Sequence, residues 1–335
     1  MIAARLGKHD LLQRVLWAVR SSGWNAIVLS QTPPFRLSIF DGNTTLVVLC
    51  YIWNMTHGGF PRNPNELRIQ ITGVDRFRVE PGVKTLLLGW SEEERMFAGF
   101  DVRKHLISMK GRSPSLQVRR ETLHTAKVKD FFPQIRGNQE NVIAFRPEFF
   151  VTYMQELEDL HGAAQRPVDV KRLEEIAAND IEWQVRDVPA GPRRTVMEKI
   201  RRKVRDARFR KNVLAAYGFR CAMSDIQLDL LDAAHIIPVE HSKGTDETRN
   251  GLCLSALHHR AFDQGLIGIK RNYSIIFNEE RFDRLRALGW DGGESEFKKI
   301  CRDAINLPKR KEFYPDRDYL ILGQVLRGWN PKAFT

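Results

Sequence analysis

The residues best able to do chemistry lie between positions 221 and 267 of this 335-residue chain. His235 stands in the run Ala-Ala-His-Ile-Ile-Pro, and Asn250 in the run Arg-Asn-Gly-Leu. His259 comes nine residues after Asn250, and Asp263 follows four residues later. An imidazole with a pKa near 6.5 can take a proton at neutral pH. Side chains at i and i+4 share a helical face, so residues 259 and 263 can meet one ligand.

The surrounding residues predict the elements that position these side chains. Residues 228–238 indicate a strand ending at a histidine and a proline, and a polar loop with Gly244 follows. Residues 249–254 indicate a turn into a second short strand. Residues 255–265 predict a helix that Ser255 caps and Gly265 ends. The order is therefore strand, loop, strand, helix.

This segment resembles the HNH endonuclease family and its ββα-metal core. The pieces that carry the resemblance are Ala-Ala-His-Ile-Ile-Pro, Asn-Gly-Leu and His-His-x-x-Phe-Asp-x-Gly, in this order. They are most similar to the subgroup found in restriction-type nucleases. The resemblance covers roughly residues 195–280 and implies hydrolysis of phosphodiester bonds.

The resemblance also implies a role for each motif residue. His235 matches the general base, and Asn250 matches the middle residue, which pins the loop or binds metal in some relatives. His259 and Asp263 match two metal ligands on the helix. One divalent ion is expected, Mg²⁺ first, with Mn²⁺, Ni²⁺ or Zn²⁺ as alternatives; it would bind a phosphate oxygen and stabilise the departing 3′ oxygen.

Two positions depart from the family pattern. Many relatives place a metal ligand directly before the general base, where this chain has Ala234. Asp232, two residues earlier on the predicted strand, is our candidate substitute, with water or Asn250 as the alternative. The positions of the zinc-binding C-x-x-C pairs of relatives hold Cys221, Ser224, Ser255 and His258. Two plausible ligands are too few for a closed tetrahedral site, so we predict no structural zinc and expect buried thiols.

The charge of the chain points to a polyanionic partner. The formal net charge is +12, and residues 193–220 hold eleven basic side chains against two acidic ones. Apolar stripes predict a helix over 195–217 that breaks near Ala207. A solvated outer helix face is the alternative interpretation of this charge. The candidate nucleic-acid contacts on this helix are Arg201, Arg202, Lys203, Arg205, Arg208, Arg210 and Lys211.

The sequence predicts an α+β protein, with a β-rich N-terminal domain followed by the nuclease domain. We expect a DNA-recognition domain at residues 1–160, a connector at 161–194, and the HNH domain with its basic lead-in helix at 195–335. The sequence leaves the N-terminal fold open between a barrel and an open sheet. The longest apolar run, Leu46 to Trp53, has eight residues, too few for a membrane span, and four scattered cysteines favour a reducing cytoplasm.

These features favour a metal-dependent DNA endonuclease of restriction or defence type. Its N-terminal domain would read a sequence or a modified base, and its partner would be double-stranded DNA. Because one such site cuts one strand, we expect a homodimer. The alternatives are a nonspecific nickase or ribonuclease, and a DNA-binding regulator with a degenerate nuclease core, which the alanine at position 234 favours.

Overall fold

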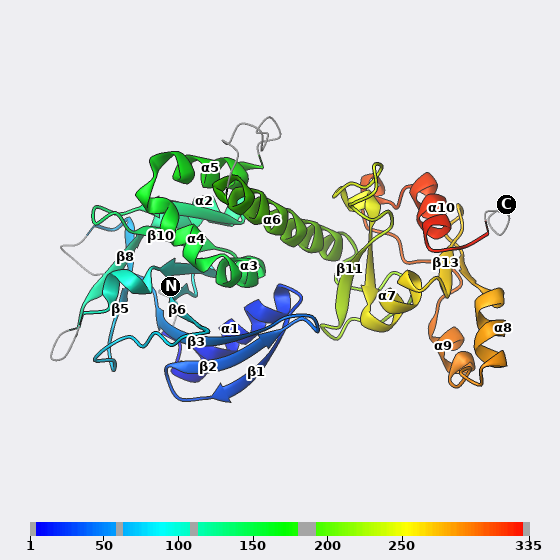
Figure 1. Ribbon diagram of the computed structural model, residues 1–335, viewed down its shortest axis with the longest axis horizontal. Helices are drawn as coiled ribbons and strands as arrows, with labels where there is room; N and C mark the ends of the chain where they lie inside the picture. The colour runs from blue at the N-terminus through cyan, green and yellow to red at the C-terminus, as the bar shows by residue number, and fades with distance from the viewer. Residues whose placement is uncertain (1–4, 58–62, 108–112, 180–191, 331–335) are drawn as a thin grey trace. The chain divides into compact units, whose positions relative to one another are not determined.

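The computed structural model describes residues 5–57, 63–107, 113–179 and 192–330, with only the backbone described at 192 and 193. The chain divides into two compact units, Met1–Ala207 and Arg208–Thr335. Helices and strands occur in both, so the α+β class with a β-rich N-terminal part is confirmed (Figure 1). The domain limits expected from the sequence remain predictions.

The first unit is built on an open, seven-stranded sheet in the order β1-β2-β3-β6-β7-β10-β9. The central pair β3–β6 is parallel, and the other neighbouring pairs are antiparallel. Because β1 and β9 are edge strands, the sheet is open and does not close into a barrel. The bounds are β1 Asn25–Ser30, β2 Phe35–Phe40, β3 Thr45–Asn54, β6 Val83–Ser91, β7 Met96–Phe100, β9 Phe131–Ile135 and β10 Asn141–Phe145.

Both faces of this sheet are covered. On β3, the side chains of Val48, Cys50 and Ile52 enter one apolar core, and those of Leu49 and Tyr51 enter the other. A strand buried on both faces explains the unbroken apolar run of the sequence. A three-stranded sheet contributes to the second core; its strands are β4 Thr56–His57, β5 Glu66–Gln70 and β8 Ser115–Arg119.

The helices of the first unit differ in part from the sequence-based expectation. Residues 150–162 form two short helices, separated at Glu156. The expected connector contains α5, whose Leu173 and Ile176 are buried in the first core; its residues 180–191 lie outside the described residues. The bounds are α1 Lys8–Ser21, α2 Arg120–Lys129, α3 Phe150–Gln155, α4 Leu157–Gly162 and α5 Pro167–Ala178.

The basic segment forms one uninterrupted helix, α6, from Pro192 to Ala216. The predicted break near Ala207 is therefore wrong. Ile200 and Val204 belong to the core of the first unit, whereas Phe209 and Val213 belong to the core of the second. The two apolar stripes are out of phase because each one packs in a different core.

After the last part of α6, the second unit has a strand, loop, strand and helix, as the motif predicts, and β13 and β14 then form a hairpin. The last described residues, 294–330, contain the helices α9 and α10 (Figure 1). The bounds are β11 Leu231–His235, β12 Gly251–Ser255, α7 Ala256–Asp263, β13 Ile267–Ile269, β14 Ile275–Phe277, α8 Glu279–Ala287, α9 Glu294–Ile300 and α10 Arg317–Leu326.

Within the described ranges, the chain has no helix with both the length and the apolar character that a bilayer crossing requires.

Candidate active site

The site is built on an antiparallel hairpin in which His235 pairs with Gly251 and Asp232 with Leu254. The next element, α7, is capped as predicted by Ser255, whose side chain accepts a hydrogen bond from the backbone N–H of His258. A Cβ on Gly251 would lie 2.3 Å from Cγ2 of Val213. Glycine is therefore needed here because α6 passes close to the hairpin.

His235 is held by two neighbours that the sequence analysis did not identify. Its Nε2 lies 3.1 Å from Oδ1 of Asp246, and an ionised carboxylate only accepts, so Nε2 carries the proton. Its ring stacks on Phe209, with ring centroids 3.7 Å apart and planes 5° apart. No hydrogen bond joins Nδ1 to any residue that the structure describes. The side chain is 23% exposed, so water can reach this imidazole.

Asn250 is fully buried and pins the loop between the two strands. Its Oδ1 accepts from the backbone N–H of Ile237 at 2.9 Å. Its Nδ2 donates to the carbonyls of Ile237 at 2.9 Å and Thr245 at 2.8 Å. These contacts engage both ends of the amide, which supports the loop-pinning role over metal binding.

His259 lies between two carboxylates. Its Nδ1 is 3.6 Å from Oδ2 of Asp232, and its Nε2 is 3.2 Å from Oδ2 of Asp263. Burial lowers the pKa of His259, but the two carboxylates outweigh it and raise this pKa to about 9. Burial raises the pKa values of Asp232 and Asp263, but contacts with His259 and a nearby arginine shift both below the usual range. The three predicted metal ligands are therefore neighbours.

The donor chemistry of these three residues suits a divalent cation, because carboxylate oxygens and imidazole nitrogens bind Mg²⁺, Mn²⁺ or Zn²⁺. Their arrangement is not a preformed metal site. The carboxylates face opposite nitrogens of His259, and each also contacts an arginine: Asp232 contacts Arg210 at 3.0 Å and Asp263 contacts Arg327 at 3.0 Å. Among the described residues, no three His, Cys, Asp or Glu side chains are placed to hold an ion.

The positions of the family's zinc ligands hold a buried cluster of hydrogen bonds. His258 is fully buried, and its Nδ1 lies 2.7 Å from Oγ of Ser255. Its Nε2 lies 3.5 Å from Sγ of Cys301. Burial raises the pKa of Cys221, but hydrogen bonds from His258, Ser224 and the N–H of Ser255 lower it to about 7. His258 thus faces the core, and Cys221 is buried with polar partners rather than as a simple apolar side chain.

The candidate DNA contacts on α6 divide into two groups. Lys203 binds the buried carboxylate of Glu156 at 2.6 Å, and Arg210 binds Asp232 and the carbonyl of Leu231. These two side chains stabilise their own units. Arg201 and Arg202 are exposed, and Arg205, Arg208 and Lys211 are partly exposed. The second group keeps its standing as predicted contacts with a phosphate backbone.

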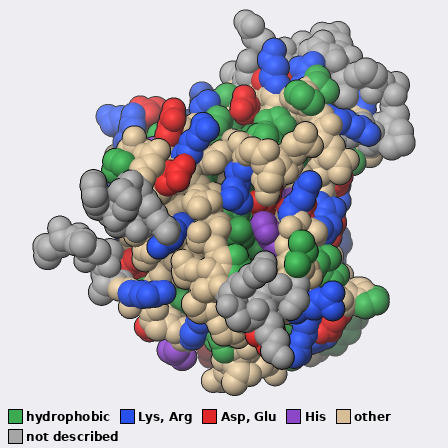
Figure 2. All heavy atoms as spheres, turned by 90° about the vertical axis from the view of Figure 1, so that its left-hand side faces the viewer, with side chains coloured by type: hydrophobic (Ala, Val, Ile, Leu, Met, Phe, Trp, Pro, Cys, Tyr) green, Lys and Arg blue, Asp and Glu red, His purple; other side chains and the backbone are tan. Residues whose placement is uncertain are grey.

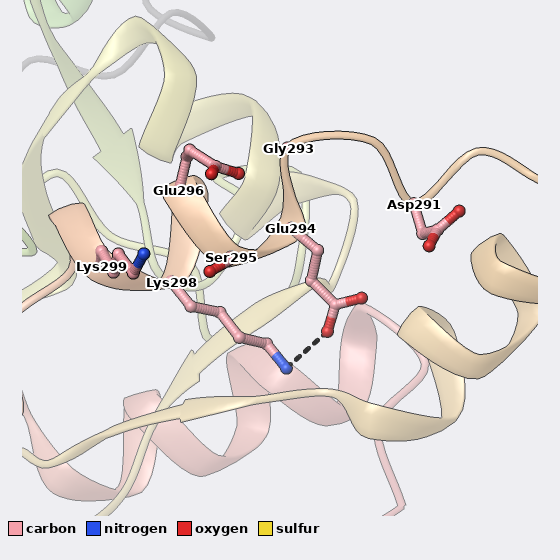
Figure 3. Close-up of a pocket in the computed structure, with 7 residues that line it drawn as sticks. All are labelled: Asp291, Gly293, Glu294, Ser295, Glu296, Lys298 and Lys299. Carbon is pink, nitrogen blue, oxygen red and sulfur yellow. Dashed lines mark ion pairs between the residues drawn. The ribbon is translucent and has the colours of Figure 1, made fainter.

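Two hollows lie away from the motif. One is lined by residues 291–299, where Glu294 and Lys298 form an ion pair at 2.8 Å (Figure 3). The other, about 90 Å³, lies in the first unit beside the buried side chains of Asp101 and His161. On the face shown in Figure 2, basic and acidic side chains are interspersed. Neither hollow contains a predicted site residue.

Two strands, a pinned loop and a helix that bring a histidine and a histidine–aspartate pair together define a ββα nuclease core. Residues 221–270 match the HNH endonuclease family, and residues 47–154 match the family described as Methylase-associated X1. The chain therefore carries an HNH endonuclease domain.

No curated protein is similar enough to this chain to count as a relative. A solved structure titled "Modification dependent TagI restriction endonuclease" is 12% identical, with a TM-score of 0.29, and the match covers 82% of this chain and 80% of that chain. Similarity at this level bears on neither fold nor function.

Proposed function

We propose that this protein is a metal-dependent DNA endonuclease of restriction or defence type. The observation that carries the proposal is the state of His235: its Nε2 is bound by Asp246, while its Nδ1 is without a partner among the described residues. A carboxylate on one nitrogen orients the ring and stabilises the imidazolium that forms when the other nitrogen takes a proton. His235 can therefore act as the general base toward water, with Nδ1 as the receiving atom.

His259 and Asp263 are the proposed ligands for one divalent cation, with Asp232 as a third. When bound, the ion would polarise a phosphate oxygen and stabilise the leaving 3′ oxygen. To bind it, His259 must release its proton, because only the neutral ring offers a lone pair. Mg²⁺ remains the first expectation, with Mn²⁺, Ni²⁺ and Zn²⁺ as alternatives. No structural zinc is proposed.

Double-stranded DNA is the proposed substrate. The exposed arginines of α6 supply phosphate contacts, which set affinity and salt dependence without reading sequence. The first unit would supply recognition of a sequence or a modified base; its match to a family described as methylase-associated supports this assignment. We keep the homodimer and the cytoplasmic location as predictions, the second resting on four free cysteines.

The DNA-binding regulator remains the second candidate. Ala234 is buried and cannot bind metal, and both carboxylates near His259 already contact arginines. Carboxylates that are already paired with arginines are what we expect of a nuclease domain that no longer binds a metal ion. A nonspecific nickase or ribonuclease would use the same residues on a broader substrate.

A supercoiled-plasmid assay tests the proposal. We expect nicking and then linearisation in Mg²⁺ or Mn²⁺, and no cleavage in EDTA. Plasmids with and without base modification, and a structured RNA, are incubated in parallel. Tight DNA binding without cleavage in Mg²⁺, Mn²⁺, Ni²⁺ or Zn²⁺ would favour the regulator. Cleavage of RNA alone would favour the ribonuclease.

A further inference from the structure

Arg327 is the first residue after α10, beyond the segment that matches the HNH family. Its side chain is only 10% exposed. The helix that precedes it packs tightly against the end of β11: a Cβ on Gly323 would lie 2.4 Å from the carbonyl oxygen of Ile236. The close approach of α10 therefore brings Arg327 to the strand end that presents His235.

The guanidinium of Arg327 contacts both halves of the candidate site. Its Nη2 donates to the carbonyl of His235 at 2.9 Å and to Oδ1 of Asp263 at 3.0 Å. Its Nη1 donates to the carbonyls of Ile236 at 2.6 Å and Gly323 at 2.9 Å. Its Nε lies 3.3 Å from the same Asp263 oxygen.

The guanidinium of Arg327 also contacts an aromatic ring through one face of its plane. Its central carbon lies 4.2 Å from the centre of the Phe262 ring on α7, within the range of a cation–π contact. The planar group is therefore fixed by hydrogen bonds in its plane and by an aromatic ring above it. Lysine cannot reproduce this arrangement, because an ammonium lacks the rigid fork of donors.

We propose that Arg327 is a positioning residue for the nuclease reaction. A single nitrogen atom, Nη2, joins the backbone of the proposed base to the carboxylate of a proposed metal ligand, and so sets their separation. Oδ1 of Asp263 is held by Arg327, which leaves Oδ2 directed at Nε2 of His259. This inference rests on the proposed function and extends the site to an element outside the family match.

The test compares Arg327→Gln and Arg327→Lys with wild type. For the glutamine variant we expect kcat for plasmid nicking to fall at least tenfold, with the Kd for DNA within twofold of wild type. The lysine variant should lie in between, because it restores the charge without the fork. Arg271→Gln is the matched control, because Arg271 pairs with Asp318 of α10 and contacts no motif residue; its kcat should be unchanged.

Hydrogen–deuterium exchange supplies a readout that does not depend on activity. The amides of Ile236 and Ile237 bond to the backbone oxygen and Oδ1 of Asn250, at 2.8 and 2.9 Å. In Arg327→Gln we expect faster exchange at these two amides, with that of Leu254, which lies opposite Asp232 on the same hairpin, unchanged. Equal acceleration throughout the second unit would reveal global destabilisation and overturn the proposal, as would a kcat within twofold of wild type.

The assay separates this inference from the proposed function. If wild type cuts DNA and His235→Ala does not, a fully active Arg327→Gln variant disproves the positioning role alone. If wild type cuts nothing, the proposed function fails, and the positioning role that rests on it fails as well.

Discussion

His235 is constrained in three directions: Asp246 binds one ring nitrogen, Phe209 stacks on the ring, and Arg327 binds the backbone carbonyl. A general base needs this restraint, because proton transfer requires the correct nitrogen at a fixed place. If His235 is the base, Asp246 is its orienting partner.

Replacing the base tests this assignment at the residue scale. His235→Ala should reduce kcat by roughly 10²–10⁴-fold, and Asp246→Asn by a smaller factor, because the first removes the proton acceptor and the second only its charged partner. Single-turnover cleavage and a DNA-binding titration measure both, and we expect Kd to stay near the wild-type value. His241→Ala, in the same loop, is the control. Normal turnover in His235→Ala would eliminate it as the base.

Asn250 presents a different case, because its side-chain hydrogen bonds all go to the backbone. We expect Asn250→Ala to lower the free energy of unfolding by about 1–3 kcal/mol, since it leaves buried backbone groups unpaired. Urea unfolding and a Mn²⁺ titration of the folded protein measure the two effects separately. Unchanged stability with lost Mn²⁺ binding would instead identify Asn250 as a ligand.

At the scale of elements, helix α6 contributes both apolar side chains to the cores and basic side chains to ion pairs. Its apolar stripes are part of the cores of both units, and several of its basic side chains bind carboxylates, among them Lys199 and Lys203 with Glu156 and Arg210 with Asp232. The net positive charge of the helix therefore overstates the number of side chains that DNA can recruit.

Charge reversal on α6 tests this division. Arg201→Glu with Arg202→Glu should weaken binding to all DNA sequences and reduce the salt slope by about one for each lost phosphate contact. Fluorescence anisotropy at several salt concentrations measures both quantities. The matched control reverses two exposed basic residues of α8, Arg281 and Arg284, and should leave the slope unchanged. A loss confined to one sequence would mean that α6 reads bases.

At the scale of the whole molecule, one chain carries one candidate catalytic histidine in its HNH domain, and one such site cuts one strand. If double-strand cleavage requires two copies, linear product should appear after the nicked form, and its rate should rise more steeply than linearly with protein concentration. Sedimentation equilibrium over the same concentrations should show dimer formation. A strictly first-order dependence together with a monomer at all concentrations would contradict the homodimer.

Much of the nuclease core could be predicted from the sequence, because its information is local. Alternation, a polar loop and a capping serine identify β11, β12 and α7 within about 35 residues, and the spacing of His259 and Asp263 places both on one helical face. The same local evidence misjudged α6, because a shift between two apolar stripes looks like a break when the two cores are unknown.

The sequence by itself determined the class of chemistry, since the motif residues and their order lie in one short stretch. Only the tertiary structure decided what holds them: Arg327 contacts partners 64 and 92 residues earlier in the chain, and Phe209 of α6 stacks on His235 of β11. The physical reason is that hydrogen bonds and ring stacking require side chains within a few ångströms of each other. No sequence spacing specifies such proximity between separate elements.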